Sequence, residues 1–248
     1  MAQWNPRTSY RSIPQGRDRY IVRAIGPWLE STLLRELRER DGALTTVIDV
    51  GCGQQPLRGV VESGGARYVG FDVEQNAQGT VDVLGFLDQD LPASLTGERR
   101  YDVVLCTEVL EHVADWDTAF RNLSALVSPN GALIVTLPFI FPLHMEPVDF
   151  LRGTPYVIER LAAKYGLAVI ESHRLGRVRD VISTILDDVS ILPARRSAFS
   201  RLNARLARLA RRALVRILQS EACWGSVQLN SNTYLSNAVV LKPIDASR

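Results

Sequence analysis

The sequence contains few cysteines and no long apolar run, and both absences restrict what the protein can be. Its three cysteines, Cys52, Cys106 and Cys223, are odd in number and widely spaced, which predicts neither a disulfide framework nor a zinc site. No apolar run approaches the roughly 20 residues that a membrane-spanning helix needs. The polar first 20 residues also lack the apolar stretch of a secretory signal. We therefore expect a cytoplasmic protein that holds no metal.

Acidic residues are absent from residues 194–219, where eight arginines gather. Because the whole chain has a formal net charge of +2, the remainder is mildly acidic, with a net charge of −6. A nucleic-acid-binding protein more often spreads its basic charge over one face of the whole domain, so nucleic acid is not the expected partner. The 248 residues, 46% of them hydrophobic, suffice for one domain over residues 1–248.

Short β-branched runs alternate with helical patterns along the chain. Strands are predicted at residues 45–50, 66–73, 80–85, 101–107, 132–138, 167–175 and 232–243. Helices are predicted at residues 20–40, 116–127 and 154–166, the second closed by the turn signal Ser-Pro-Asn-Gly of residues 128–131. This alternation predicts a Rossmann-like, doubly wound α/β fold, with a mostly parallel seven-stranded sheet and helices on both faces.

Two segments lie outside this alternation. Residues 1–40 are expected to form an N-terminal arm, irregular over residues 1–19, followed by a helix. Residues 176–230 are expected to form a helical insertion before the last strand, because so long a connection is unusual.

The insertion contains a strongly amphipathic helical pattern with arginines on one face. Its apolar residues recur at steps of three and four: Phe199, Leu202, Leu206, Leu209, Ala213 and Ile217. We expect this stripe to pack on the body of the protein. A lid, a contact between two copies or a helix on anionic lipid are the alternatives, so a monomer or a homodimer is expected, with residues 194–219 as a candidate membrane contact.

Glycines and carboxylates follow the first two strands at the spacing of a nucleoside-binding site. Asp49 stands near the end of the first strand, and Gly51 and Gly53 form the turn after it. Asp72 ends the next strand, where a carboxylate can accept both hydroxyls of a ribose. Capping of a loop or helix would be the ordinary role of Asp72 alone, but the joint spacing favours a nucleoside. Pro56 stands where a dinucleotide fingerprint requires a third glycine, which disfavours NAD.

The motif series VIDVGCGQQP, YVGFD, YDVVLCTEVLEHV and PNGALIVTLP resembles that of class I methyltransferases that use S-adenosylmethionine (SAM). The resemblance covers residues 45–138 and implies SAM as cofactor, with S-adenosylhomocysteine as product. It implies that Asp72 holds the ribose and that Asp49, Gly51 and Gly53 lie near the methionine end. The remaining cofactor contacts that it implies are Cys52, Val73, Phe86, Leu87, Asp88, Cys106 and Thr107.

Two details of this resemblance concern individual acids. Asp88 is the candidate for the adenine amino group, although it stands one residue closer to the following Leu-Pro than the usual aspartate. Phe86 or Leu87 is expected to supply an apolar wall beside it. Glu111 and His112 belong to the same motif series, and we expect them to cap and pack the helix that follows.

Residues 138–154 resemble a subgroup with the pattern P-F-x-x-P-x-H-x-x-P-x-D-[YF]-x-R-x-T, which tends to act on sugars, cell-envelope precursors or natural products. His144 is the candidate general base, because a histidine of near-neutral pKa can take the proton of an acceptor hydroxyl. An equally weighted alternative is that His144 only hydrogen-bonds Glu146 or Asp149. The candidate substrate residues are Phe139, Glu146, Asp149 and Arg152, of which the last two are expected to pair and brace the loop.

The function expected from these patterns is methyl transfer from SAM to a hydroxyl of a sugar, glycan precursor or natural product. An N-methyltransferase that works by proximity alone is the nearest alternative. An NAD-dependent oxidoreductase and a non-catalytic SAM-binding protein are alternatives of other classes. Nucleic-acid methylation is disfavoured, because the chain has no Asn/Asp-Pro-Pro-aromatic tetrapeptide and no Pro-Cys nucleophile.

Overall fold

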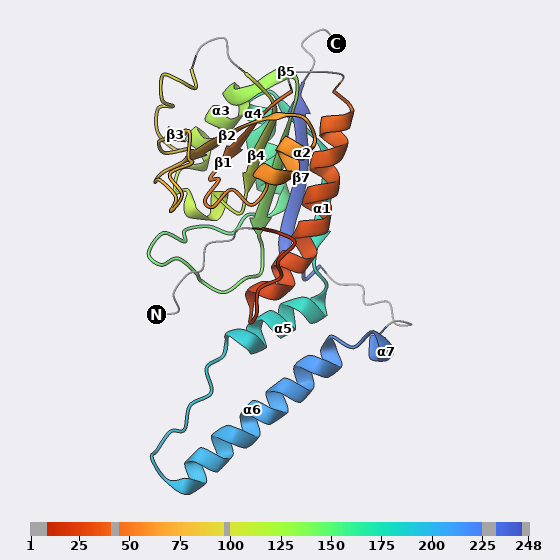
Figure 1. Ribbon diagram of the computed structural model, residues 1–248. Coiled ribbons are helices and arrows are strands. Elements are labelled where there is room, and N and C mark those ends of the chain that lie inside the picture. Colours follow the sequence, from red (N-terminus) through yellow and green to blue (C-terminus); the bar gives the residue numbers. More distant parts are fainter. Residues whose placement is uncertain (1–8, 41–44, 97–99, 225–231, 245–248) are drawn as a thin grey trace.

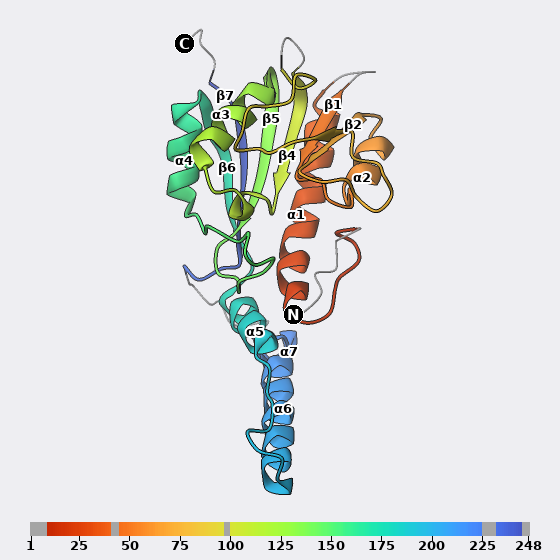
Figure 2. The ribbon, with the colours of Figure 1, turned by 90° about the vertical axis from the view of Figure 1, so that its left-hand side faces the viewer.

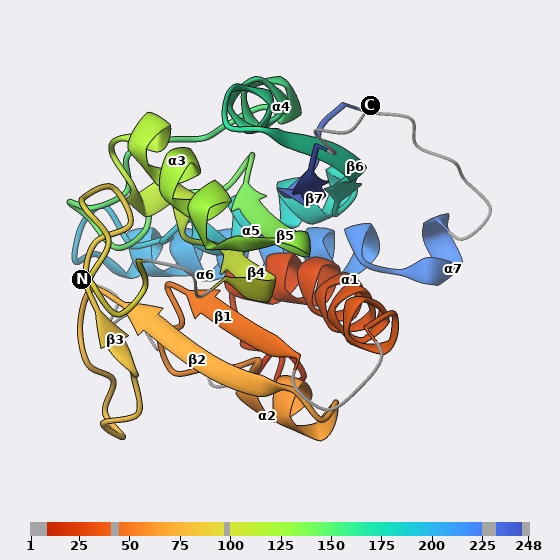
Figure 3. The ribbon, with the colours of Figure 1, turned by 90° about the horizontal axis from the view of Figure 1, so that it is seen from above.

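A single seven-stranded sheet forms the centre of the computed structural model, which describes residues 9–40, 45–96, 100–224 and 232–244. Its strands are β1 (Thr46–Val50), β2 (Arg67–Asp72), β3 (Val83–Leu84), β4 (Tyr101–Thr107), β5 (Val127–Pro138), β6 (Leu167–Leu175) and β7 (Ser236–Pro243). The strand order is β3-β2-β1-β4-β5-β7-β6, with β7 antiparallel to both of its neighbours and parallel pairing from β3 to β5 (Figure 3). The predicted mostly parallel, Rossmann-like sheet is confirmed.

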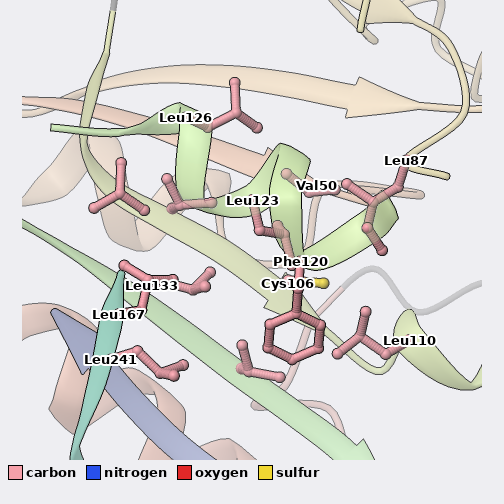
Figure 4. Packing of buried hydrophobic residues seen from close by; sticks show 14 of the residues in the cluster. Val50, Leu87, Cys106, Leu110, Phe120, Leu123, Leu126, Leu133, Leu167 and Leu241 are labelled. Carbon is pink, nitrogen blue, oxygen red and sulfur yellow. The ribbon is translucent and has the colours of Figure 1, made fainter. Parts of the chain in front are cut away.

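Helices cover both faces of the sheet, as predicted. On one face lie α1 (Asp18–Arg38) and α2 (Arg58–Ser63), and on the other lie α3 (Trp116–Leu126) and α4 (Pro155–Lys164) (Figure 3). The helical spacing of α1 buries Ile25, Leu29 and Leu33 completely. On the opposite face, Phe120 and Leu123 of α3 belong to the core cluster drawn in Figure 4. Each such side chain stabilises the fold by about 1.5–3 kcal/mol when it leaves water.

Three strands differ in extent from the prediction. β7 begins at Ser236, four residues later than predicted. β5 begins at Val127, so the expected turn at residues 128–131 lies within the strand. Val127 pairs with Tyr101 and Ala132 with Val103, which makes the Ser-Pro-Asn-Gly segment a bulge. β3 is shorter than predicted, because the carboxylate of Asp82 accepts the amide of Gly70 over 2.8 Å in place of a backbone carbonyl.

The insertion consists of α5 (Val178–Asp188), α6 (Ala198–Leu218) and the short α7 (Glu221–Trp224). In Figures 1 and 2, α6 extends away from the sheet, alongside the segment that leads into it from α5. Residues 225–230 of the predicted insertion and residues 1–8 of the predicted arm lie outside the described residues. None of the described helices is long and apolar enough to cross a bilayer.

The apolar stripe of α6 faces solvent, so the prediction that it packs on the body is wrong. The outward residues Phe199, Leu202, Leu206, Leu209 and Ile217 are each at least 50% exposed. Ala204 and Val215 are buried on the opposite face. From that face Arg211 donates hydrogen bonds to the carbonyls of Leu186 and Val189, over 3.1 and 2.7 Å. An arginine thus satisfies open carbonyls at the end of α5, and this contact fixes which side of α6 meets the protein.

Candidate active site

The turn after β1 is shaped by two glycines with positive φ. At Gly51 (φ 70°), an added Cβ would lie 2.3 Å from Cγ2 of Val109, so the turn can approach the end of β4 only with glycine here. At Gly53 (φ 49°), no atom lies within 4 Å of an added Cβ, which leaves open space beside the backbone. The amide of Gly53 donates a hydrogen bond of 2.7 Å to Oδ2 of Asp72. This bond connects the turn to the end of β2.

Apolar side chains stand exposed beside Asp72 along the same edge. Val73 and Phe86 are each about half exposed, so the carboxylate has an apolar surface next to it. Leu87, in contrast, is buried in the core, so of the two residues predicted for the apolar wall only Phe86 is exposed. Asp88 follows in a half-buried position, in a loop that the side chain of Asn122 holds through the carbonyls of residues 87 and 89. A carboxylate flanked by apolar surface suits a nucleoside, whose ribose is polar and whose base is flat.

Asp49 lies beneath the turn rather than on its open side. It is buried, and the hydroxyl of Tyr68 donates a hydrogen bond of 2.7 Å to its Oδ2. Burial raises the pKa of Asp49 to about 7, although the bond from Tyr68 opposes the shift. Cys52 is buried nearby, and burial raises the pKa of its thiol to about 12, which makes it unreactive. Both residues support the turn from below.

The end of β4 brings a residue of the N-terminal arm into the site. Cys106 is completely buried in the core, and burial raises the pKa of its thiol. Thr107 accepts a hydrogen bond of 3.5 Å from the hydroxyl of Tyr10. The arm therefore lies over the carboxyl end of the strand. Sequence analysis missed Tyr10, because an irregular arm has no periodic pattern that marks the residues facing the body.

A polar cluster adjoins the glycine turn. Val109, against which Gly51 packs, leads into the 3-10 helix η1 (Leu110–His112). Glu111 of η1 is completely buried, and its Oε1 lies 3.7 Å from Nε2 of His112 and 3.7 Å from Nε2 of His144. Burial raises the pKa of Glu111 to about 7, although the electrostatic effect of His112 lowers it. Glu111 and His112 were expected only to cap and pack a helix. They instead meet the loop that follows β5.

That loop is held on η1 by backbone and side-chain contacts. The amides of Phe150 and Leu151 donate to the carbonyl of Glu111, over 2.8 and 3.3 Å. Arg152 donates from both terminal nitrogens to the carboxylate of Asp149, over 2.5 and 2.8 Å. Burial opposes ionisation of Asp149, but its hydrogen bonds from Arg152 and from the backbone amide at residue 144 lower its pKa. The predicted bracing of the loop by Asp149 and Arg152 is confirmed.

The two carboxylates considered as partners of His144 are separated by the structure. Asp149 is the neighbour, with its Oδ2 3.3 Å from Nδ1 of His144, whereas Glu146 is exposed. Phe141 meets the His144 ring edge to face, with ring centroids 5.5 Å apart. Phe139 is stacked on the ring of Tyr234, with centroids 4.5 Å apart. Phe141 therefore packs against the histidine, while Phe139 packs against the segment that precedes β7.

The glycine turn, the acid after β2 and the polar cluster all lie at the carboxyl ends of the strands, where ligands bind open α/β sheets. A family model of a methyltransferase domain matches residues 22–172, which is more than half of the chain. The chain belongs to the methyltransferase domain family. This assignment confirms the prediction of a SAM-dependent methyltransferase and decides against the nicotinamide-dependent oxidoreductase.

Curated relatives of this methyltransferase include two enzymes named ubiquinone biosynthesis O-methyltransferase. The one from Leptothrix cholodnii is 28% identical over 199 residues, which cover 71% of this chain and 75% of that protein. The one from Bordetella avium is 28% identical over 174 residues, covering 64% of each. The similarity therefore leaves a quarter of the first relative and more than a third of the second unmatched.

Solved methyltransferase structures share the fold at low sequence identity. The O-methyltransferase from a trans-AT PKS multienzyme of Brevibacillus brevis, in complex with S-adenosyl-L-homocysteine, superposes with a TM-score of 0.54 at 16% identity, over 91% of this chain and 75% of that one. The 1,6-didemethyltoxoflavin-N1-methyltransferase of Burkholderia thailandensis gives a TM-score of 0.51 at 14% identity, over 88% and 77%. Because one of these enzymes methylates oxygen and the other nitrogen, the fold alone does not set the methylated atom.

Proposed function

We propose that this methyltransferase transfers the methyl group of SAM to a hydroxyl oxygen of a small molecule. The observation that carries the proposal is the contact between the glycine turn and the polar cluster, since Gly51 packs against Val109, two residues before Glu111. A hydroxyl acceptor must lose its proton, whereas an amine can be methylated by alignment alone. A buried polar cluster beside the cofactor turn therefore favours a hydroxyl. The O-methyltransferase names of the curated relatives support the same acceptor class.

We infer that the cofactor lies along the edge formed by β1, β2 and β4. When bound, SAM supplies an electrophilic methyl group on a sulfonium. The carboxylate of Asp72 accepts the ribose hydroxyls, while Val73 and Phe86 enclose the adenine and Asp88 accepts its amino group. The open space at Gly53 admits the methionine end. The residues beneath the turn, among them Asp49, Cys52 and Cys106, hold the backbone in place, and Thr107 bounds the site at β4.

The acceptor side is assigned to the loop of residues 139–154. Its resemblance to the subgroup pattern supports a sugar, a glycan precursor or a natural product as acceptor. We assign Phe139 and the exposed Glu146 to the acceptor surface, and we assign Asp149 and Arg152 to positioning His144. Because Nδ1 of His144 lies beside the Asp149 carboxylate, its proton resides on Nδ1 and the lone pair on Nε2. That lone pair can take the acceptor proton, as predicted, or bind a cation, and the position of Glu111 favours the second role.

Methyl transfer from labelled SAM tests this proposal directly. The purified protein is incubated with SAM and matched pairs of small acceptors that carry either a hydroxyl or an amine at the same position. We expect methyl ethers by mass spectrometry, and we expect calorimetry to show binding of SAM but not of NAD. Methylation of the amine members alone would contradict the assignment of a hydroxyl acceptor.

We also propose that α6 contacts an anionic membrane surface and that the protein acts on the cytoplasmic side. The stripe of Phe199, Leu202, Leu206, Leu209 and Ile217 is exposed, and arginines flank it. Residues 194–219 carry eight arginines and no acid, so pairing of two such helices would bring sixteen positive charges together. An anionic lipid surface complements both the charge and the apolar stripe. The three cysteines are free thiols, in keeping with a reducing compartment.

A further inference from the structure

The structure assigns a divalent cation site to Glu111, His112 and His144, where the sequence predicted no metal. One ligand atom from each residue, a carboxylate oxygen and two imidazole nitrogens, lies within 4.8 Å of the others. The three residues come from η1 and from the loop after β5, which the backbone bonds between Glu111 and residues 150 and 151 hold together. The site therefore belongs to the fixed frame of the protein.

Glu111 provides the first argument for a cation. It is completely buried, and no described residue donates a hydrogen bond to either of its carboxylate oxygens. Removing a carboxylate from water without a hydrogen-bond donor or a positive charge is costly, and buried acids are normally paired or bound to a metal. Among the described residues, the imidazoles of His112 and His144 lie within 4 Å of its Oε1, each 3.7 Å away and too distant for a hydrogen bond. The charge of Arg152 acts on Glu111 from farther away, and Arg152 donates no hydrogen bond to it. A cation between these three groups removes the deficit.

The two histidines provide an independent argument through their other ring nitrogens. Nδ1 of His112 donates to the carbonyl of Val148 over 2.5 Å. Nδ1 of His144 lies 3.3 Å from Oδ2 of Asp149 and 3.4 Å from the carbonyl of Pro142. With both protons held on Nδ1, the Nε2 lone pairs of both rings face Glu111. Metal-binding histidines are oriented in this way, by an acceptor on the nitrogen that does not bind the ion.

The ligand set also limits the kind of ion. Imidazole and carboxylate together suit first-row transition ions such as Zn²⁺, Mn²⁺ or Fe²⁺, whereas Mg²⁺ and Ca²⁺ prefer oxygen ligands throughout. Metal-ligand bonds of 2.0–2.2 Å place ligand atoms about 3.0–3.5 Å apart. The two carboxylate–imidazole distances of 3.7 Å need to contract by only a few tenths of an ångström, and the two imidazole nitrogens start within 4.8 Å of each other. Three protein ligands leave coordination positions open, as catalytic sites require.

The role of the ion rests on the proposed function, although its binding does not. An acceptor hydroxyl that coordinates the ion loses its proton to solvent water more readily than a free one. The acceptor oxygen then forms its bond to the methyl carbon while the carbon–sulfur bond breaks, with both electrons left on sulfur. In this arrangement His144 is a metal ligand, and the general base predicted from the sequence is not needed.

Metal binding is tested on the full chain after dialysis against EDTA and removal of the chelator. Co²⁺ absorption spectra and Zn²⁺ calorimetry are expected to show about one ion per chain. Glu111→Gln, His112→Ala and His144→Ala are each expected to weaken Zn²⁺ binding at least tenfold, and Asp149→Asn by about 10–100-fold through the orientation of His144. His173→Ala is the matched control, because His173 is the third histidine of the chain and lies beside Glu171, outside the cluster. Circular dichroism verifies that each variant folds.

The site would be overturned if either His112→Ala or His144→Ala bound Zn²⁺ as tightly as the wild type. The methyltransferase activity of His112→Ala distinguishes the two roles of His144. If His144 is a general base, this variant is expected to keep full activity. If His112 and His144 share an ion, the variant is expected to lose activity. If the ion binds and no hydroxyl is methylated, the proposed function fails and the site stands. If the metal-free protein methylates hydroxyls at the wild-type rate, the catalytic role of the ion fails, the proposed function stands, and the binding experiments alone decide the site.

Discussion

The carboxylate of Asp72 accepts the backbone amide of Gly53 through Oδ2, over 2.7 Å, and this bond joins the end of β2 to the turn after β1. Its Oδ1 accepts the amide of Val73 over 2.7 Å. Both oxygens are therefore oriented by the backbone before a ligand arrives, and each keeps a second lone pair. A pre-oriented carboxylate loses little conformational entropy on binding a ribose, which strengthens the bond.

Asp72→Asn is expected to weaken SAM binding about 10–100-fold, because hydrogen bonds to a charged group contribute about 1.5–3 kcal/mol. Asparagine keeps an oxygen for the amide of Gly53, so the turn is expected to stay intact. Calorimetry with SAM measures the loss. The control is Asp82→Asn, since Asp82 also accepts a backbone amide, that of Gly70, but stands before β3. Equal affinities of the two variants would refute the ribose contact.

Gly53→Ala is expected to abolish measurable SAM binding while the protein remains folded. An added Cβ meets no described protein atom within 4 Å. The stability lost is therefore only that of holding alanine at a positive φ, about 1–2 kcal/mol. Gly79→Ala is a matched control, because Gly79 also has positive φ and open space. Both variants should lose similar stability, and only Gly53→Ala should lose the cofactor. Gly51→Ala is expected to lose more stability than either, through its collision with Val109.

Asp49→Asn is expected to change how stability depends on pH. The folded pKa of about 7 exceeds the ordinary value of 3.8, so the stability that the protonated acid contributes is fully present below about pH 4. That stability is lost as the pH rises through 7, in total on the order of 4 kcal/mol. Asparagine carries no charge and still accepts a hydrogen bond from the hydroxyl of Tyr68. The free energy of unfolding of the variant should therefore rise relative to that of the wild type between pH 4.5 and 8.

Urea unfolding of both proteins across this range measures the difference in unfolding free energy. Every other acidic residue, Glu111 included, is present in both proteins, so their effects largely cancel in the difference. A difference that stays constant with pH would contradict the raised pKa of Asp49.

Leu206→Gln combined with Leu209→Gln is expected to abolish sedimentation with vesicles that contain phosphatidylglycerol. The wild type should bind these vesicles, bind pure phosphatidylcholine far less, and detach as salt rises, because arginines contribute about 1 kcal/mol each near an anionic surface. Ile170→Gln is the control, since Ile170 is equally exposed but lies on β6. Light scattering that shows a dimer, without vesicle binding, would assign the stripe to a second copy.

The sheet and the cofactor edge could be predicted because their signals are local. A β-branched run followed by two glycines specifies a strand and a turn. Asp72, at the end of β2, stands about 20 residues later, which is the spacing of a nucleoside-binding βαβ unit. The exact register could not be obtained in this way. The Ser-Pro-Asn-Gly segment has the composition of a turn, yet β5 continues through it as a bulge, since pairing with β4 resumes at Ala132.

The cation site and the outward stripe of α6 could not be predicted, because both depend on contacts between distant segments. Glu111 and His144 are separated by 33 residues, and the amides of residues 150 and 151 bring them together through backbone bonds that no side-chain pattern encodes. In α6 the periodicity identifies an apolar face but not what it meets. The carbonyls after α5, which accept Arg211, determine that the opposite face meets the body.

The position of Tyr10 over Thr107 has a kinetic consequence. Its backbone also packs close to Gly26 of α1, where an added Cβ would come within 3.0 Å of the Tyr10 carbonyl oxygen, so the arm is seated at two points. We expect the arm to restrict cofactor exchange, so that replacing Tyr10 by alanine speeds the release of S-adenosylhomocysteine and weakens the binding of SAM.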